Sequence, residues 1–241
     1  MKYSLVLGIA LLLAGCAGVP VTPEGFRYKE VATEYLSVAV WERDISAGRP
    51  IRFYIEGDGD PAPKNAVALK MAAKDAYQNV VYVSRPCQYV QSAVCKHKNL
   101  WREDRFNPDV VAQMEEIIRY IATKYRAPSV ELVGYDGGAT MALLLADKLP
   151  VTKIVTIAGI LDTDAYTTFH QLPPIDGINP IEYRTALAKI PQIHYVGEND
   201  KQTTSFMAER FVHKLPNPVS AEVKSVAGVG HADWEHVRLD Y

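Results

Sequence analysis

The chain has 241 residues, a formal net charge of −2 and 48% hydrophobic residues. This length suits one domain with a single core, and the hydrophobic fraction is ordinary for a globular protein. The net charge near zero argues against a nucleic-acid-binding protein, because such proteins usually carry a clear basic excess.

Residues 1–15 have the pattern of an export signal. Lys2 precedes an apolar run over residues 5–13 that is too short to span a bilayer comfortably. The ending Leu-Ala-Gly-Cys resembles the lipobox of bacterial lipoproteins, which implies cleavage before Cys16 and lipid attachment to its thiol. By the same analogy, Ala17 in place of an Asp retention signal favours an anchor in the outer membrane, facing the periplasm. An ordinary signal peptide with an incidental cysteine is the alternative.

Residues 16–23 are expected to form a short tether, and residues 24–241 a single domain. The helix with the clearest signals begins at Asn107, a good capping residue, and has Pro108 at its first position. The predicted elements, in chain order, are strands in 37–44 and 49–61 (the latter ending in a Gly-rich loop), a helix in 64–76, a strand in 79–87, a helix in 107–125, a strand in 129–135, a helix in 137–149, strands in 152–159 and 191–197, a helix in 204–215, a strand in 218–228 and a helix in 232–241.

Strands that alternate with helices, several of them continuous apolar runs, predict a parallel sheet covered on both faces. The expected fold class is therefore α/β, with an open, mostly parallel, doubly wound sheet. Ligands bind such sheets at the carboxyl ends of the strands, so the loops that follow the strands are where a functional site is expected.

Three of these loops carry candidate catalytic side chains. Asp136 lies between Gly134 and Gly138, and Asp200 and His231 follow two later strands. Nucleophile, acid and histidine follow one another in this order in the α/β-hydrolase triad. The sequence therefore resembles the α/β-hydrolase fold superfamily, and more narrowly a group of exported bacterial lipoproteins with this fold, through the segments YIEGDG, RPCQY, LVGYDGG, AGILDTDAY and GVGH.

The resemblance implies that Asp136 stands at the tip of a nucleophile elbow, where the usual residue is Ser. The tip lies at a helix N-terminus, where backbone N–H groups and the helix dipole favour negative charge. We therefore expect a lowered pKa for Asp136. The implied oxyanion hole takes one N–H from Gly137 and a second from the EGDGDP loop, where Asp58 and Gly59 are both candidates.

The resemblance gives His231 the role of general base and Asp200 the role of the acid that orients it. Glu198, Asp162 and Asp164 are the competing acids. Asp200 is preferred to all three.

An ionised aspartate can attack an electrophilic carbon and form an alkyl-enzyme ester, which a histidine-activated water then hydrolyses. Haloalkane dehalogenases and epoxide hydrolases, on the same fold, work in this way. Attack of Asp136 on an ordinary ester would form an anhydride, so plain esterase chemistry is disfavoured. Gly137 stands where the dehalogenases place a halide-binding Trp. Epoxide opening needs acidic hydroxyls, and Tyr166 and Tyr183 lie in a predicted small cap at about 162–184; packing of the cap is the favoured alternative for both tyrosines.

Cys87 and Cys95 are the remaining cysteines, and an exported protein meets an oxidising compartment, so they are expected to form a disulfide. A zinc site that includes His97 is the weaker alternative, because four ligands at a recognisable spacing are missing. No cofactor or metal motif is present in the sequence.

Two functions follow from these observations. The first is a hydrolase anchored in the bacterial cell envelope that acts on a small substrate through Asp136, His231 and Asp200. The second is an inactive lipoprotein with a hydrolase fold that binds a ligand or a protein partner. Contact with the membrane is expected through the lipid anchor at Cys16, and none with nucleic acid.

Overall fold

The computed structural model describes residues 21–58, 62–96, 100, 102 and 104–241. The predicted signal peptide, the lipidation site Cys16 and most of the tether lie outside the described residues, as do Gly59 and His97. Within the described part of the chain, no helix is long and apolar enough to cross a membrane.

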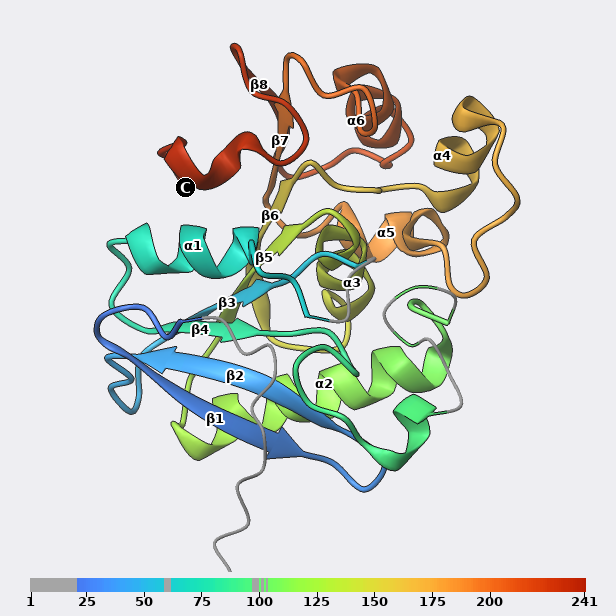
Figure 1. Cartoon of the computed structure of the whole chain (residues 1–241). Helices are drawn as coiled ribbons and strands as arrows, with labels where there is room; N and C mark the ends of the chain where they lie inside the picture. The colour runs from blue at the N-terminus through green and yellow to red at the C-terminus, as the bar shows by residue number, and fades with distance from the viewer. Residues whose placement is uncertain (1–20, 59–61, 97–99, 101, 103) are drawn as a thin grey trace, which may run out of the picture.

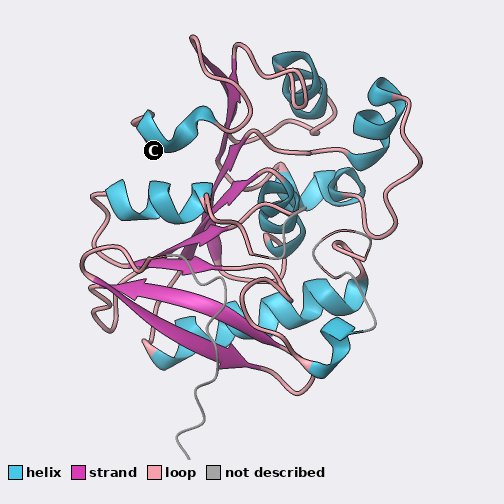
Figure 2. Cartoon of the chain, in the orientation of Figure 1, coloured by secondary structure: helices cyan, strands magenta, loops and turns pink. Residues whose placement is uncertain are grey.

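One twisted sheet of eight strands runs through the molecule, with helices on both of its faces (Figure 2). The order across the sheet is β1-β2-β4-β3-β5-β6-β7-β8. β2 pairs antiparallel with β1 and β4, and the other pairings are parallel, which confirms the predicted fold class. The strands are β1 (Phe26–Ala32), β2 (Ser37–Arg43), β3 (Ile51–Ile55), β4 (Val80–Val83), β5 (Val130–Tyr135), β6 (Val151–Ile157), β7 (Gln192–Gly197) and β8 (Ala221–Val226).

The helices divide between the two faces of the sheet (Figure 1). α1 packs in one apolar cluster with the C-terminal residues, while α2, α3 and α6 pack in clusters on the other face. The bounds of the helices are α1 (Val67–Lys74), η1 (Ala93–Lys96), α2 (Pro108–Lys124), α3 (Gly137–Leu145), α4 (Thr163–His170), η2 (Pro180–Tyr183), α5 (Arg184–Leu187), α6 (Ser205–His213) and η3 (Asp233–His236).

Helix α2 forms as its sequence predicts. The Asn107 side chain accepts a hydrogen bond from the Asp109 N–H at 2.9 Å, and Pro108 occupies the first helical position. One face of the helix is apolar and buried, and it consists of Val110, Met114, Ile117, Ile118 and Ile121.

Two predictions of secondary structure are wrong. The first strand of the structure is β1, whereas the first predicted strand was residues 37–44. β1 has charged and half-exposed residues, which do not give a clear strand pattern in the sequence. Residues 232–241 do not form a last helix: only the short η3 is helical, and the chain beyond it runs without regular structure. The reason is the alternation of Val237, Leu239 and Tyr241, which all pack on the same face of the sheet.

The fold brings the loops of the parallel strands to one edge of the sheet. β4 lies on one side of β3 and β5 on the other, so the strand order reverses at β3. Crevices for ligands form at such reversal points, beyond the carboxyl ends of the strands. The predicted disulfide between Cys87 and Cys95 is present and closes the loop after β4 at this edge.

Candidate active site

The corner between β5 and α3 has the geometry of a strained elbow. Asp136 has φ 51° and ψ −121°, a conformation that residues with a side chain rarely adopt. A Cβ at Gly134 would lie 2.2 Å from the Gly138 carbonyl oxygen, and one at Gly138 would lie 2.2 Å from the Ile55 carbonyl oxygen. The two flanking glycines are therefore required for α3 to pass so close to β3 and β5.

Three side chains from separate loops meet at this corner. His231 Nε2 lies 3.4 Å from Asp136 Oδ1, and His231 Nδ1 lies 2.9 Å from Asp200 Oδ2. Asp200 is held by the loop after β7, because its Oδ1 accepts the backbone N–H groups of Gln202 and Thr203. The Thr203 hydroxyl donates to Asp200 Oδ2 at 2.7 Å. The sequence-predicted Asp136, His231 and Asp200 thus form one hydrogen-bonded chain.

The two carboxylates make His231 a strong base. Burial opposes protonation of the imidazole, but the hydrogen bonds and charges of Asp136 and Asp200 outweigh burial and raise the pKa of His231 from 6.5 to about 10. Burial likewise favours a neutral Asp200, yet the hydrogen bonds from His231 and Thr203 outweigh it and lower the pKa of Asp200. At neutral pH the site therefore holds an imidazolium between two carboxylates.

A second aspartate, Asp58 in the loop after β3, lies beside the elbow and shares a hydrogen bond with Asp136. Burial and the charge of Asp136 raise the pKa of Asp58. Burial would also raise the pKa of Asp136, but the hydrogen bonds from His231, Asp58 and the Gly137 N–H lower it, which is the expected direction. When the aspartate pair holds a proton, that proton therefore favours Asp58.

The place predicted for the oxyanion hole is already occupied by carboxyl groups of the protein. The Gly137 N–H lies next to the carboxylate of Asp136 and helps to lower its pKa. The Asp58 carboxyl lies against Gly137, since a Cβ at Gly137 would lie 1.8 Å from Asp58 Oδ1. The side chain of Asp58, rather than its backbone N–H, therefore lies at the helix N-terminus where an anion is expected.

Two arginines at the site were not predicted from the sequence. Arg105 Nε lies 2.7 Å from Asp58 Oδ2, and Arg85 interacts electrostatically with both Asp58 and Asp136. The signal that could have found Arg85 is its place two residues after the end of β4, in a loop at the carboxyl edge. Arg105 precedes α2 and follows no strand, so the sequence offered no comparable signal.

The competing acids make other contacts. Asp162 caps α4 through the Ala165 N–H and forms an ion pair with Lys214 at 2.5 Å. Glu198 is exposed and accepts the backbone N–H of Gly228. Asp164 lines a separate cavity of about 400 Å³ with Asp162, Ala165, Thr168, Phe169, Ile181, Arg210 and Lys214. Of the four candidate acids, Asp200 is the one that the described structure places in contact with His231.

The two tyrosines of the predicted cap have different positions. Tyr166 on α4 is half-buried, its ring centre lies 4.6 Å from that of His170, and burial and the charge of Asp136 raise its pKa. Tyr183 on η2 is partly buried and packs against the apolar clusters on the α2 and α6 face of the sheet. Packing therefore accounts for Tyr183, while Tyr166 lies within electrostatic range of Asp136.

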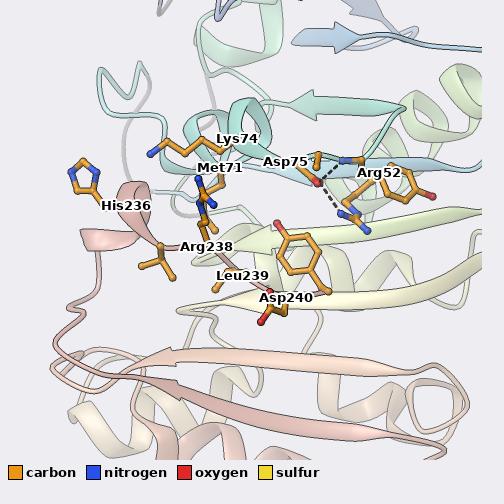
Figure 3. Close-up of a pocket in the computed structure, with 12 residues that line it drawn as sticks. Arg52, Met71, Lys74, Asp75, His236, Arg238, Leu239 and Asp240 are labelled. Carbon is orange, nitrogen blue, oxygen red and sulfur yellow. Dashed lines mark hydrogen bonds and ion pairs between the residues drawn. The ribbon is translucent and has the colours of Figure 1, made fainter.

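A larger cavity of about 1030 Å³ lies away from this corner (Figure 3). It opens between the start of β3, the end of α1 and the C-terminal segment, at the opposite end of β3 from Asp58. Arg52, its most deeply buried cation, is paired with Asp75 at 2.8 Å and with Glu131 at 2.7 Å. The cavity contains none of the three residues of the hydrogen-bonded chain.

No family model matches the chain. A probable 2-oxo-3-(5-oxofuran-2-ylidene)propanoate lactonase from a Bradyrhizobium species is 27% identical over 135 residues, which are 55% of this chain and 52% of that protein. The match thus spans about half the length of that curated relative.

Solved structures resemble the chain over most of its length. An esterase from Pyrococcus furiosus has a TM-score of 0.63 and 15% identity, with 86% of this chain and 83% of that chain covered. The carboxylesterase CesB from Bacillus subtilis has a TM-score of 0.59 and 12% identity, with 89% and 88% covered. Est1E from Butyrivibrio proteoclasticus has a TM-score of 0.62 and 9% identity, with 86% and 90% covered. Together with the strand order and the elbow after β5, these likenesses show that the chain has an α/β-hydrolase-like fold.

Proposed function

We propose that the chain is a hydrolase that uses Asp136 as its nucleophile, His231 as its base and Asp200 to hold His231 in place. The observation that carries the proposal is the position of His231 between two carboxylates, one of which stands at the tip of the elbow. An ionised Asp136 needs no base to remove a proton before it attacks carbon.

The charges of the site support a two-step reaction. In the first step an Asp136 oxygen bonds to a substrate carbon, the bond from that carbon to its leaving oxygen breaks, and the leaving oxygen takes a proton. Asp58, whose pKa is raised to about 7, would supply this proton when it is protonated. The ester that forms has no negative charge, so the pKa of His231 falls and the imidazole becomes available as a base.

In the second step His231 removes a proton from water, and the water oxygen attacks the carboxyl carbon of Asp136. The negative charge of the tetrahedral intermediate develops on the former carbonyl oxygen of the ester. The Gly137 N–H next to Asp136 would stabilise that charge. When the intermediate collapses, the bond to the alcohol oxygen breaks, that oxygen takes the proton from His231, and Asp136 is restored with one oxygen exchanged from water.

The covalent ester gives a direct test. The panel of substrates contains epoxides, alkyl esters and lactones, the last because the curated relative is named as a lactonase. In His231→Gln the ester on Asp136 should accumulate and add the mass of the alkyl group to the peptide that contains Asp136. In wild type, one turnover in heavy-oxygen water should label the Asp136 carboxylate. Turnover without label in wild type would refute the mechanism.

His236→Gln is the matched control, because His236 is exposed on η3 and contacts Glu235 rather than the elbow. This variant should hydrolyse every substrate at the wild-type rate.

The alternative is an inactive protein that binds a ligand at the same corner. It is favoured by the position of the Asp58 carboxyl against Gly137, where a substrate oxygen would be expected. Hydrolysis that disappears in Asp136→Ala and persists in His236→Gln would exclude this alternative.

The proposal also places the protein in the bacterial cell envelope, anchored through a lipid on Cys16 in the outer membrane and facing the periplasm. The support is the resemblance of residues 1–16 to a lipoprotein signal. Cys16→Ser should move the protein from the membrane fraction to the soluble fraction and abolish labelling by a fatty acid. A membrane-bound, unlabelled wild-type protein would contradict the lipid anchor.

A further inference from the structure

Arg85 is a fully buried cation whose hydrogen bonds are incomplete. It follows β4 after Ser84, and Gln88 in the disulfide loop accepts its backbone N–H at 2.9 Å. Its Nη2 donates to the Arg105 carbonyl oxygen at 2.5 Å. Its Nε and Nη1 are buried without an acceptor among the described residues. Because unpaired buried donors are costly, these two N–H groups are positioned for an acceptor from outside the protein.

Arg105 provides a second cation at the same place. Both guanidinium groups lie 5.5 Å from the centre of the Phe106 ring. Arg105 Nε lies 2.7 Å from Asp58 Oδ2, and Arg85 interacts electrostatically with Asp58 and Asp136. Two guanidinium groups therefore lie beside the aspartate pair, and the Asp58 carboxyl contacts both Arg105 and Gly137.

The charges at the site do not balance. Arg85, Arg105 and His231 are positive at neutral pH. Against these three positive charges stand the carboxylates of Asp136 and Asp200 and the carboxyl group of Asp58, whose pKa burial and the charge of Asp136 raise to about 7. Because Asp58 is only partly ionised at neutral pH, positive charge exceeds negative charge at the site, and an anionic ligand would reduce the excess.

We propose that Arg85 and Arg105 form the binding site for a carboxylate group of the substrate, next to Asp136. A carboxylate has a single charge and accepts several hydrogen bonds, which matches the unused N–H groups of Arg85. The Arg105 side chain is 17% exposed, so an entering carboxylate meets Arg105 before the fully buried Arg85. In identifying the ligand as the substrate, the inference rests on the proposed hydrolase function; the binding site itself does not.

Binding of small carboxylates tests the site without any need for turnover. The probes are propanoate, pyruvate and benzoate, each compared with its neutral amide at pH 7 by calorimetry and by ligand-observed NMR. Wild type should bind at least one acid about tenfold more tightly than its amide, since charge-assisted hydrogen bonds are roughly twice as strong as neutral ones. Arg105→Gln should abolish this preference.

Arg85→Gln should abolish the preference as well, and Arg105→Gln remains informative if the buried substitution prevents folding. Arg238→Gln is the matched control, because Arg238 lines the cavity of Figure 3 at the other end of β3. A preference that survives in a folded Arg105→Gln protein, or that disappears in Arg238→Gln, would refute the site. So would a folded wild-type protein that binds no acid better than its amide.

Failure of this inference and failure of the proposed hydrolase function give different results. Asp136→Ala removes the nucleophile but leaves both arginines, so it should still prefer acids to amides. If wild type binds carboxylates and hydrolyses nothing, the binding site stands and the hydrolase function fails. If wild type hydrolyses neutral substrates and binds no carboxylate, the hydrolase function stands and the binding site is refuted.

Discussion

Replacement of Asp136 by Asn should change the protonation of His231 by an amount that the structure allows us to work out. Asn has nearly the same shape as Asp and has no charge. The pKa of His231 rises from 6.5 to about 10 through two carboxylates acting against burial. Asp136 lies 3.4 Å from Nε2 and contributes at least as much as Asp200. Loss of Asp136 should therefore weaken proton binding by about a hundredfold, or about 2.7 kcal/mol.

The same change alters the dependence of stability on pH. Because the pKa of His231 is higher in the folded protein than in the unfolded chain, its contribution to stability is complete below pH 6.5 and is lost as the pH rises through about 10. That contribution is on the order of 4 kcal/mol in wild type. Asp136→Asn should lose the larger part of it at neutral pH.

Two measurements check this reasoning. Nitrogen NMR of the imidazole over pH 5 to about 11 follows protonation of His231 directly. Urea unfolding over the same range follows stability, and His236→Gln serves as the control for the exposed histidine. A wild-type His231 that loses its proton near pH 6.5, or an Asp136→Asn protein with an unchanged titration, would refute the ion pair.

Three further predictions concern other parts of the molecule. Burial raises the pKa of Glu56 from 4.5 to about 7, so stability should fall as the pH rises through that range. Glu56→Gln should remove this fall and raise the free energy of unfolding, measured in urea, by about 2 to 3 kcal/mol above pH 7. A stability of Glu56→Gln that falls with pH as steeply as that of wild type would contradict this prediction. Replacement of Cys87 and Cys95 together by Ser should lower the unfolding free energy by about 2.5 kcal/mol, and no change in the denaturation midpoint would argue against a stabilising disulfide. Asp200→Asn should reduce turnover by about 10⁴-fold and Asp162→Asn by little, and the reverse order in steady-state assays would exchange their roles.

The sequence predicts the alternating framework well, because the buried strands and α2 carry strong periodic patterns. β4 is a continuous apolar run, β3 is apolar except for Arg52, and both are buried along their whole length. β1 was not predicted because its own hydrophobic pattern is weak, and its pairing with β2 stabilises it as a strand. The C-terminal segment is misread because its apolar residues suit a helix or an extended chain, and contact with the sheet decides between them.

The core of the site is also predictable, since chain order alone singles out Asp136, Asp200 and His231. Order along the chain carries information there because each residue follows its own strand. The contact between Asp58 and Asp136 was not predicted. The sequence suggested a role for the backbone N–H of Asp58, whereas the fold brings its side chain to Asp136. No spacing rule connects Asp58 with Arg105, because a loop after β3 meets the segment before α2 only in three dimensions.

The surroundings of Asp136 explain why the aspartate cannot be considered apart from its neighbours. A carboxylate at this corner is stabilised by His231, by the Gly137 N–H and by the proton that Asp58 shares with it. Exchange of Asp136 for Ser would remove one negative charge and leave the cations in place, with Asp58 still lying against Gly137. Asp58 would then be free to ionise, and a carboxylate would occupy the place that an ester oxyanion needs. If Asp136 acts as proposed, a serine at the same position would therefore lack the free oxyanion donors that serine chemistry requires.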